Sequence, residues 1–115
     1  MKRRHSEFLC PKFQAAMDIL SRPWNGLIMA TLAGNGTLRF SELRERLDAM
    51  GDRMLSERLK ELEASGLIKR RVSSGPPVRV DYELTEVGHG FSDVSSAIGR
   101  WGECITAAGK PRKRA

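Results

Sequence analysis

Four polar side chains share one side of the helix that the sequence predicts over residues 52–65. They are Arg53, Ser56, Glu57 and Lys60. Arginine can hold guanine with two hydrogen bonds, serine can contact a base or a phosphate, glutamate can accept from the cytosine amino group, and lysine can contact a nucleic-acid backbone. By itself the pattern favours an ordinary solvated face, because every amphipathic helix has a polar side. The elements around this helix decide between the two interpretations.

The two cysteines are the other candidates for chemistry. Cys10 and Cys104 lie 94 positions apart and form neither a metal-binding motif nor a disulfide framework, so both are expected as reduced thiols. Cys10 precedes Pro11, and proline suits the first turn of a helix. A helix N-terminus with Lys12 and Arg4 nearby favours the reactive thiolate, whereas a small buried hydrophobic residue is the alternative interpretation.

The sequence offers little for catalysis. His5 lies in a basic arm and His89 follows a glycine, and no carboxylate pair, Ser/His arrangement or phosphate-binding loop accompanies either. We therefore expect no enzyme, no cofactor and no metal site. No apolar run approaches the roughly 20 residues of a membrane span, and the first residues lack the apolar segment of a secretory signal. We expect no membrane partner and a cytoplasmic, nucleoid-associated protein.

The first half of the chain predicts three helices and a short extended segment. Apolar side chains recur at helical spacing over 11–20 and again over 23–33, where a glycine-rich stretch ends the pattern. Residues 38–40 follow as an extended segment. Ser41 is a good N-cap, because its hydroxyl can accept from the free N–H groups of a first turn, and it opens a helix over 42–47.

A hairpin follows the polar helix directly. The other side of that helix is apolar and carries Leu55, Leu59 and Leu62. Gly66 suits a left-handed helix cap, and strands are expected over 68–73 and 78–84, separated by a proline-containing turn over 74–77. The alternation of the second strand turns four side chains inward: Val78, Val80, Tyr82 and Leu84. A helix that passes straight into a hairpin is typical of a recognition helix with a wing.

The last predicted helix, over 85–108, begins at Thr85 as its cap. Its apolar residues recur every 3.5 positions on average, which is typical of a seam against another helix. The seam residues are Phe91, Val94, Ile98, Trp101 and Ile105. Several glycines weaken this helix in isolation, so we expect it to pack in a homodimer.

The charge is concentrated at the two ends of the chain. The formal net charge is +6, with 20 basic and 14 acidic residues in 115. Seven basic residues belong to the ends, which leaves 13 basic against 14 acidic residues over 5–109. Within that body, residues 38–79 carry ten basic and seven acidic side chains. The high pI therefore belongs mainly to the ends, but the middle of the body, with the polar helix, is electropositive.

The order of these elements looks like a winged helix-turn-helix domain, and the motifs resemble one family. They are Cys10-Pro11, Trp24 at the start of a helix, Arg39-Phe40-Ser41-Glu42-Leu43, the stretch MLSERLKELE over 54–63, Gly66-Leu67-Ile68, and VDYELT over 80–85 with Gly88. Together they resemble the HxlR-type bacterial transcription regulators of the MarR-like superfamily, over about residues 10–101. Family members usually carry Gly-Gly-Lys before the tryptophan, where this chain has Ser21, Arg22 and Pro23, and Ser or Thr where it has Gly51 and Asp52.

The resemblance implies roles for further residues. The start of the helix before the recognition helix usually faces phosphate, which implicates Arg39, Ser41 and Arg44. The wing would lie along the neighbouring minor groove and implicates Arg71, Ser74 and Arg79, whereas Lys69 and Arg70 are equally consistent with ordinary strand-edge charges. Arg58 is either structural or a phosphate contact.

Some family members use a cysteine just before the first helix to sense oxidants or electrophiles, and Cys10 stands at that position. We expect Cys10 of one subunit to approach Cys104 of the other.

We expect a mainly α fold with a small β-hairpin wing (α+β), dimerising through its N- and C-terminal helices. The expected organisation is a flexible basic arm over 1–9, a winged helix-turn-helix domain over 10–108, and a basic disordered tail over 109–115. The expected function is a sequence-specific, double-stranded DNA-binding repressor that occupies a pseudo-palindromic operator and responds to an electrophile or oxidant. The alternative is a winged helix that binds proteins and has no sequence-specific DNA binding.

Overall fold

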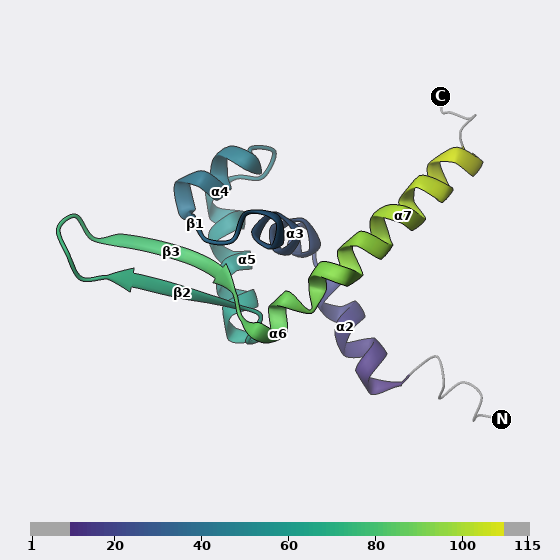
Figure 1. The fold of residues 1–115 in the computed structure, drawn as a ribbon, viewed down its shortest axis with the longest axis horizontal. Coiled ribbons are helices and arrows are strands. Elements are labelled where there is room, and N and C mark those ends of the chain that lie inside the picture. The colour runs from purple at the N-terminus through teal and green to yellow at the C-terminus, as the bar shows by residue number, and fades with distance from the viewer. Residues whose placement is uncertain (1–9, 110–115) are drawn as a thin grey trace.

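The computed structural model describes residues 10–109, a helical body with a hairpin on one side (Figure 1). Its elements are α2 (Pro11–Ser21), α3 (Asn25–Asn35), β1 (Leu38–Arg39), α4 (Phe40–Arg46), α5 (Asp52–Ala64), β2 (Ile68–Ser73), β3 (Arg79–Leu84), α6 (Glu86–His89) and α7 (Phe91–Gly109). The expected mainly α fold with a hairpin wing is confirmed. The basic arm over 1–9 and the basic tail from 110 onward lie outside the described residues, and Gly109 ends α7.

The three strands form an antiparallel sheet in the order β1-β3-β2. In β3, Tyr82 lies opposite Leu38 of β1 on one side and Arg70 of β2 on the other. β2 and β3 extend beyond β1 as the wing, which points away from the helices (Figure 1). Val78 was expected to face inward, but it precedes β3 and is 66% exposed. That prediction is wrong because the outer half of the wing has no helix to pack against.

The core lies between α3, α4, α5 and the base of the sheet. The expected apolar side of α5 is confirmed, since its three leucines are almost completely buried. They pack with the buried side chains Ile28, Leu32, Leu43, Ile68 and Leu84. Burying one such side chain contributes about 1.5–3 kcal/mol, so this face anchors α5 and leaves its polar side outward.

Two helix starts differ from the prediction. α3 begins at Asn25, because Trp24 adopts a left-handed conformation (φ 74°) that turns the chain between α2 and α3. The side-chain amide of Asn25 donates to the carbonyl of Ile19 and holds this turn. Ser41 is not an N-cap. α4 begins two residues earlier than predicted, at Phe40, and the carboxylate of Glu42 accepts from the N–H of Arg39, so a serine cap is not needed.

The predicted last helix is two helices. Thr85 is the expected cap, since its hydroxyl oxygen accepts from the N–H of Gly88 while its O–H donates to the carbonyl of Gly66. α6 then ends at His89, and α7 starts in a new direction after Gly90 (Figure 1). None of the helices in residues 10–109 combines the length and apolar character that a membrane-spanning helix needs.

Candidate nucleic-acid interface

α4 and α5 form a helix-turn-helix, and the polar side of α5 faces solvent. Arg53, Glu57 and Lys60 are exposed and Ser56 is half-buried, so the structure presents the four predicted residues together on one helix. Among residues 10–109, neither Arg53 nor Lys60 forms an ion pair. Two cationic side chains on this face are therefore available to a negatively charged partner.

The unusual acidic start of α5 has a partner. Asp52 pairs with Arg44 of α4 at 3.3 Å, and both side chains are exposed. A surface pair of this kind contributes at most about 1 kcal/mol, so a phosphate could compete for Arg44. Arg39 and Ser41, the other two candidates at the start of α4, are exposed.

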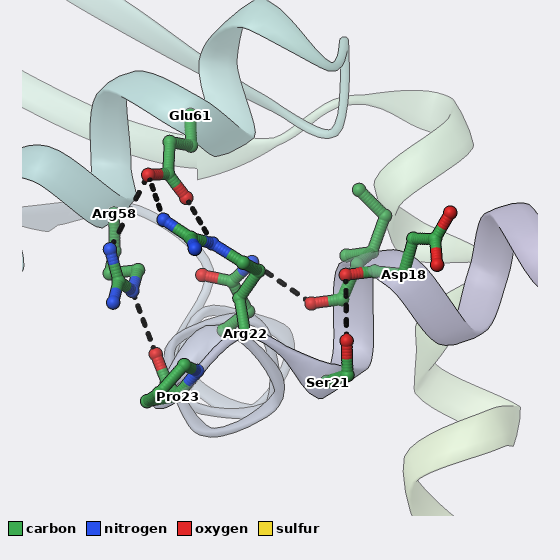
Figure 2. A network of polar contacts seen from close by, with 8 residues as sticks. Asp18, Ser21, Arg22, Pro23, Arg58 and Glu61 are labelled. Atoms are coloured by element: carbon green, nitrogen blue, oxygen red, sulfur yellow. Dashed lines mark hydrogen bonds and ion pairs between the residues drawn. The ribbon is translucent and has the colours of Figure 1, made fainter.

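Arg58 does not belong to this exposed set. It is 6% exposed, and its Nε donates to the carbonyl oxygen of Pro23 at 2.9 Å, while Nη1 lies 3.4 Å from Glu61 (Figure 2). A buried guanidinium with these partners cannot reach DNA without abandoning them. Of the two roles expected for Arg58, the structural one fits, and its proposed phosphate contact is wrong.

Arg22 and Glu61 complete a polar network that the sequence patterns did not predict. Arg22 donates from Nε and Nη2 to the two carboxylate oxygens of Glu61, at 3.2 and 2.6 Å (Figure 2). These hydrogen bonds lower the pKa of Glu61 below its ordinary value, and the carboxylate in turn raises the pKa of Arg22. The network ties the turn between α2 and α3 to α5. The two residues are 39 positions apart in the sequence. The one feature that could have pointed to the network is Arg22 itself, because the family usually has glycine at that position.

Two cations on the outer face of the wing are paired with one carboxylate. Glu83 on β3 lies 2.8 Å from Arg71 and 3.4 Å from Lys69, and it accepts a hydrogen bond from Thr37. The hydrogen bond from Thr37, with those from the two cations, lowers the pKa of Glu83 although desolvation opposes it. Arg71 is therefore already paired. The remaining wing candidates, Ser74 and Arg79, are exposed near the end of the hairpin.

An open hollow of about 280 Å³ lies between α5 and the inner face of the wing. Its lining residues are Ser56, Lys60, Glu63, Arg70 and Tyr82. Arg70 and Tyr82 were not predicted as site residues. The available signal was strand alternation, which places Arg70 and its neighbour Arg71 on opposite faces.

The two cysteines are free thiols in this structure. Cys10 is half-buried at the N-terminal end of α2, and Cys104 is exposed on α7. Four of the five expected seam residues are exposed: Val94, Ile98, Trp101 and Ile105. The prediction for Phe91 is wrong, because it is only 9% exposed and packs in the core beside Gly26. The bend after α6 turns Phe91 inward.

Known proteins are similar to this chain in sequence and in fold. The HxlR-like helix-turn-helix family matches residues 19–109. YvaP of Bacillus subtilis (strain 168), an uncharacterised HTH-type transcriptional regulator, is 45% identical over 93 residues, 81% of this chain and 85% of YvaP. The reduced form of the transcriptional regulator YodB from B. subtilis has a TM-score of 0.77 at 36% identity, covering 90% of this chain and 98% of that one. The redox regulator HypR in its oxidised form has a TM-score of 0.74 at 33% identity, covering 83% of this chain and 96% of that one.

The relatives are transcriptional regulators, and their family spans the helix-turn-helix, the wing and α7 of this structure. The chain therefore belongs to the HxlR family of helix-turn-helix transcriptional regulators.

Proposed function

We propose that this protein is a sequence-specific repressor that binds double-stranded DNA as a homodimer. In this proposal α5 enters the major groove of each half-site, and the wing lies along the adjacent minor groove. The half-sites lie about one helical turn apart on a pseudo-palindromic operator. Because the operator is chromosomal in this proposal, the protein would be associated with the nucleoid.

The observation that carries this proposal is the exposed polar side of α5. Arg53 and Lys60 form no ion pair within residues 10–109, whereas Arg58 of the same helix is buried and paired. Arg53 stands in the first turn, where a recognition helix contacts base edges. Ser56 and Glu57 are one turn further along, and contacts to the backbone would come from Arg39, Ser41, Arg44, Ser74 and Arg79.

Substitution of Arg53 tests this assignment. The operator is first selected from a random duplex pool with wild-type protein, and affinities are then measured by fluorescence anisotropy. Arg53→Lys keeps the charge but loses the two-pronged hydrogen bonding to guanine. It should weaken selected-site binding by about 1–3 kcal/mol and relax the preference at one base pair, with non-specific binding unchanged.

Unchanged base preference in Arg53→Lys would show that Arg53 does not contact a base. Absence of wild-type binding to any duplex at low salt would remove the DNA-binding proposal. The alternative, a winged helix that binds proteins, would then remain. Two observations favour this alternative: the body of the chain has a near-neutral charge, and Glu57 lies in the exposed face of α5.

We also propose that Cys10 senses an oxidant or electrophile. Its support is its position at the start of α2 and the relatives: YodB has been crystallised quinone-bound, and HypR is a redox regulator. Oxidation would remove one hydrogen from Cys10 of one subunit and one from Cys104 of the other. The oxidant takes up both hydrogens, and an S–S bond forms that changes the spacing of the two α5 helices.

Operator affinity measured before and after diamide tests this sensing step. Diamide should change the affinity of wild-type protein, and neither Cys10→Ser nor Cys104→Ser should respond. A wild-type affinity that diamide leaves unchanged would contradict the proposal. A response that persists in Cys104→Ser would remove the crosslink but keep Cys10 as the sensor.

A further inference from the structure

The hollow between α5 and the wing is lined from two elements. Arg70 and Tyr82 are directly opposite each other in the β2–β3 register, so their side chains lie on the same face of the hairpin. That face is turned toward α5, because Ser56, Lys60 and Glu63 of α5 line the same hollow. The hollow therefore joins the proposed recognition helix to the inner face of the wing.

The charges of the hollow are unbalanced. On the outer face of the wing, Lys69 and Arg71 are both paired with Glu83. In the hollow, neither Arg70 of the wing nor Lys60 of α5 has an acidic partner within 4.0 Å among residues 10–109. Glu63 is the one acidic residue of the lining, so the five residues carry a net positive charge.

Tyr82 adds a polar group with no partner in the protein. Its side chain is only 9% exposed and its ring belongs to the core. The hydroxyl makes no hydrogen bond to any of residues 10–109, yet it is not sealed from solvent. A hydroxyl that reaches solvent and has no partner among residues 10–109 is free to donate to a ligand.

The position of the hollow identifies the ligand. With α5 in the major groove and the wing along the minor groove, the sugar-phosphate backbone that separates the two grooves must cross the corner between them. The hollow lies between α5 and the wing, so in this docking it would face that backbone. Two unpaired cations and two hydroxyls are the donors that phosphate oxygens accept from.

We infer that this hollow is the binding site for a backbone phosphate of the bound DNA. Its hydrogen-bond donors are Arg70, Lys60 and the hydroxyls of Tyr82 and Ser56. The inference rests on the proposed DNA-binding function and adds two residues to it. Arg70 contributes charge, and Tyr82 contributes a hydrogen bond from a side chain that its own packing holds in place. Because the contact is to phosphate, it strengthens binding to every sequence and leaves base preference unchanged.

The test compares Arg70→Ala with Lys69→Ala. The two variants lose the same charge from adjacent positions of β2, but only Arg70 faces the hollow. Duplex affinity is measured by fluorescence anisotropy over a series of salt concentrations. Arg70→Ala should reduce the slope of log affinity against log salt by about 0.9, the value for one neutralised phosphate, and Lys69→Ala should keep the wild-type slope.

Tyr82→Phe tests the hydroxyl alone, because phenylalanine keeps the buried ring. It should weaken binding by about tenfold, as expected for a lost hydrogen bond to a charged group, with the salt slope unchanged. Duplexes with a neutral methylphosphonate at single positions then locate the contact. A neutral phosphate between the two grooves should weaken wild-type binding and have little further effect on Arg70→Ala.

The outcomes separate the two proposals. If wild-type protein binds duplex and Arg70→Ala has the same salt slope and methylphosphonate pattern as Lys69→Ala, the inferred phosphate site is wrong. The proposal of DNA binding then stands. If wild-type protein binds no duplex, both are wrong. Thermal unfolding by circular dichroism verifies that each variant is folded. If Tyr82→Phe does not fold, the comparison of Arg70→Ala with Lys69→Ala still tests the phosphate site.

Discussion

Arg53 and Arg58 lie on the same helix and have opposite surroundings. Arg53 is exposed and forms no ion pair within residues 10–109, whereas Arg58 lies against the core and donates to Pro23 and Glu61. The sequence left two roles open for Arg58, a structural one and a phosphate contact. Only the turn after α2, which supplies the carbonyl of Pro23, decides that Arg58 is structural.

Glu61 should make stability depend on pH. The hydrogen bonds from Arg22 lower the folded-state pKa of Glu61 below the ordinary value of 4.5. Desolvation opposes them, and the charges of Arg22 and Arg58 lower the pKa further. A lowered folded-state pKa gives stability that is complete above the unfolded value and is lost as pH falls through the folded value. The free energy of unfolding should therefore decrease below about pH 4.5, and less so in Glu61→Gln.

Urea unfolding from neutral pH into this acidic range measures that difference. Glu45→Gln is the matched control, because Glu45 is exposed and forms no ion pair among residues 10–109. Its acid dependence should follow the wild type. If the free energy of unfolding fell equally with pH in Glu61→Gln and the wild type, the ion pair between Glu61 and Arg22 would not form in solution.

At the scale of elements, the junction between the wing and α6 depends on a close backbone contact. A Cβ on Gly88 would lie 2.0 Å from the carbonyl oxygen of Leu67, a distance that real Cβ atoms do not adopt. The same segment is held by Thr85, whose backbone N–H donates to the Leu67 carbonyl. The short helix α6 therefore sits directly on the base of the wing.

Two glycine substitutions should change stability in opposite directions. Gly88→Ala should destabilise the protein by about 1–3 kcal/mol, because the methyl group has no space and its nearest neighbour is backbone. Gly99→Ala in α7 should stabilise by up to about 1 kcal/mol, because nothing lies within 4 Å and alanine favours the helix. Urea unfolding measures both, and equal stabilities would contradict the close contact at Gly88.

At the scale of the whole molecule, the wing and α7 project from opposite sides of the body (Figure 1). Four apolar side chains along α7 are exposed, namely Val94, Ile98, Trp101 and Ile105, and so are Phe13 and Met17 on α2. Exposed apolar surface of this extent usually marks an interface. A second copy on this surface would leave both wings and both α5 helices free for DNA.

Trp101→Glu should disrupt the proposed dimer. Trp101 is 67% exposed in the single chain, so the fold should survive, but a charge at a helix–helix seam is costly to bury. Ser96→Glu adds the same charge on the other side of α7 and is the control. Sedimentation velocity should show a monomer for Trp101→Glu and a dimer for Ser96→Glu and the wild type. A monomeric wild type would contradict the proposed dimer.

Local patterns predicted most of the elements because they report burial directly. The three leucines of α5, the strand alternation at Tyr82 and Leu84, and the Thr85 cap all depend on residues within a few positions of one another. The errors have one distant and one local cause. Phe91 kept the spacing of the seam but packs in the core. Ser41 is not the cap because α4 begins at Phe40, where the neighbouring carboxylate of Glu42 accepts from the N–H of Arg39.

The sequence by itself determined the family, the order of helices and strands, and the polar side of α5, because periodicity and motif order are local properties of the chain. Tertiary structure decided which charges are available. Ion pairing joins residues such as Arg22 and Glu61, 39 positions apart, and strand pairing brings Arg70 to Tyr82 and both to α5. These contacts depend on how elements pack, so they leave no pattern that a single stretch of sequence can show.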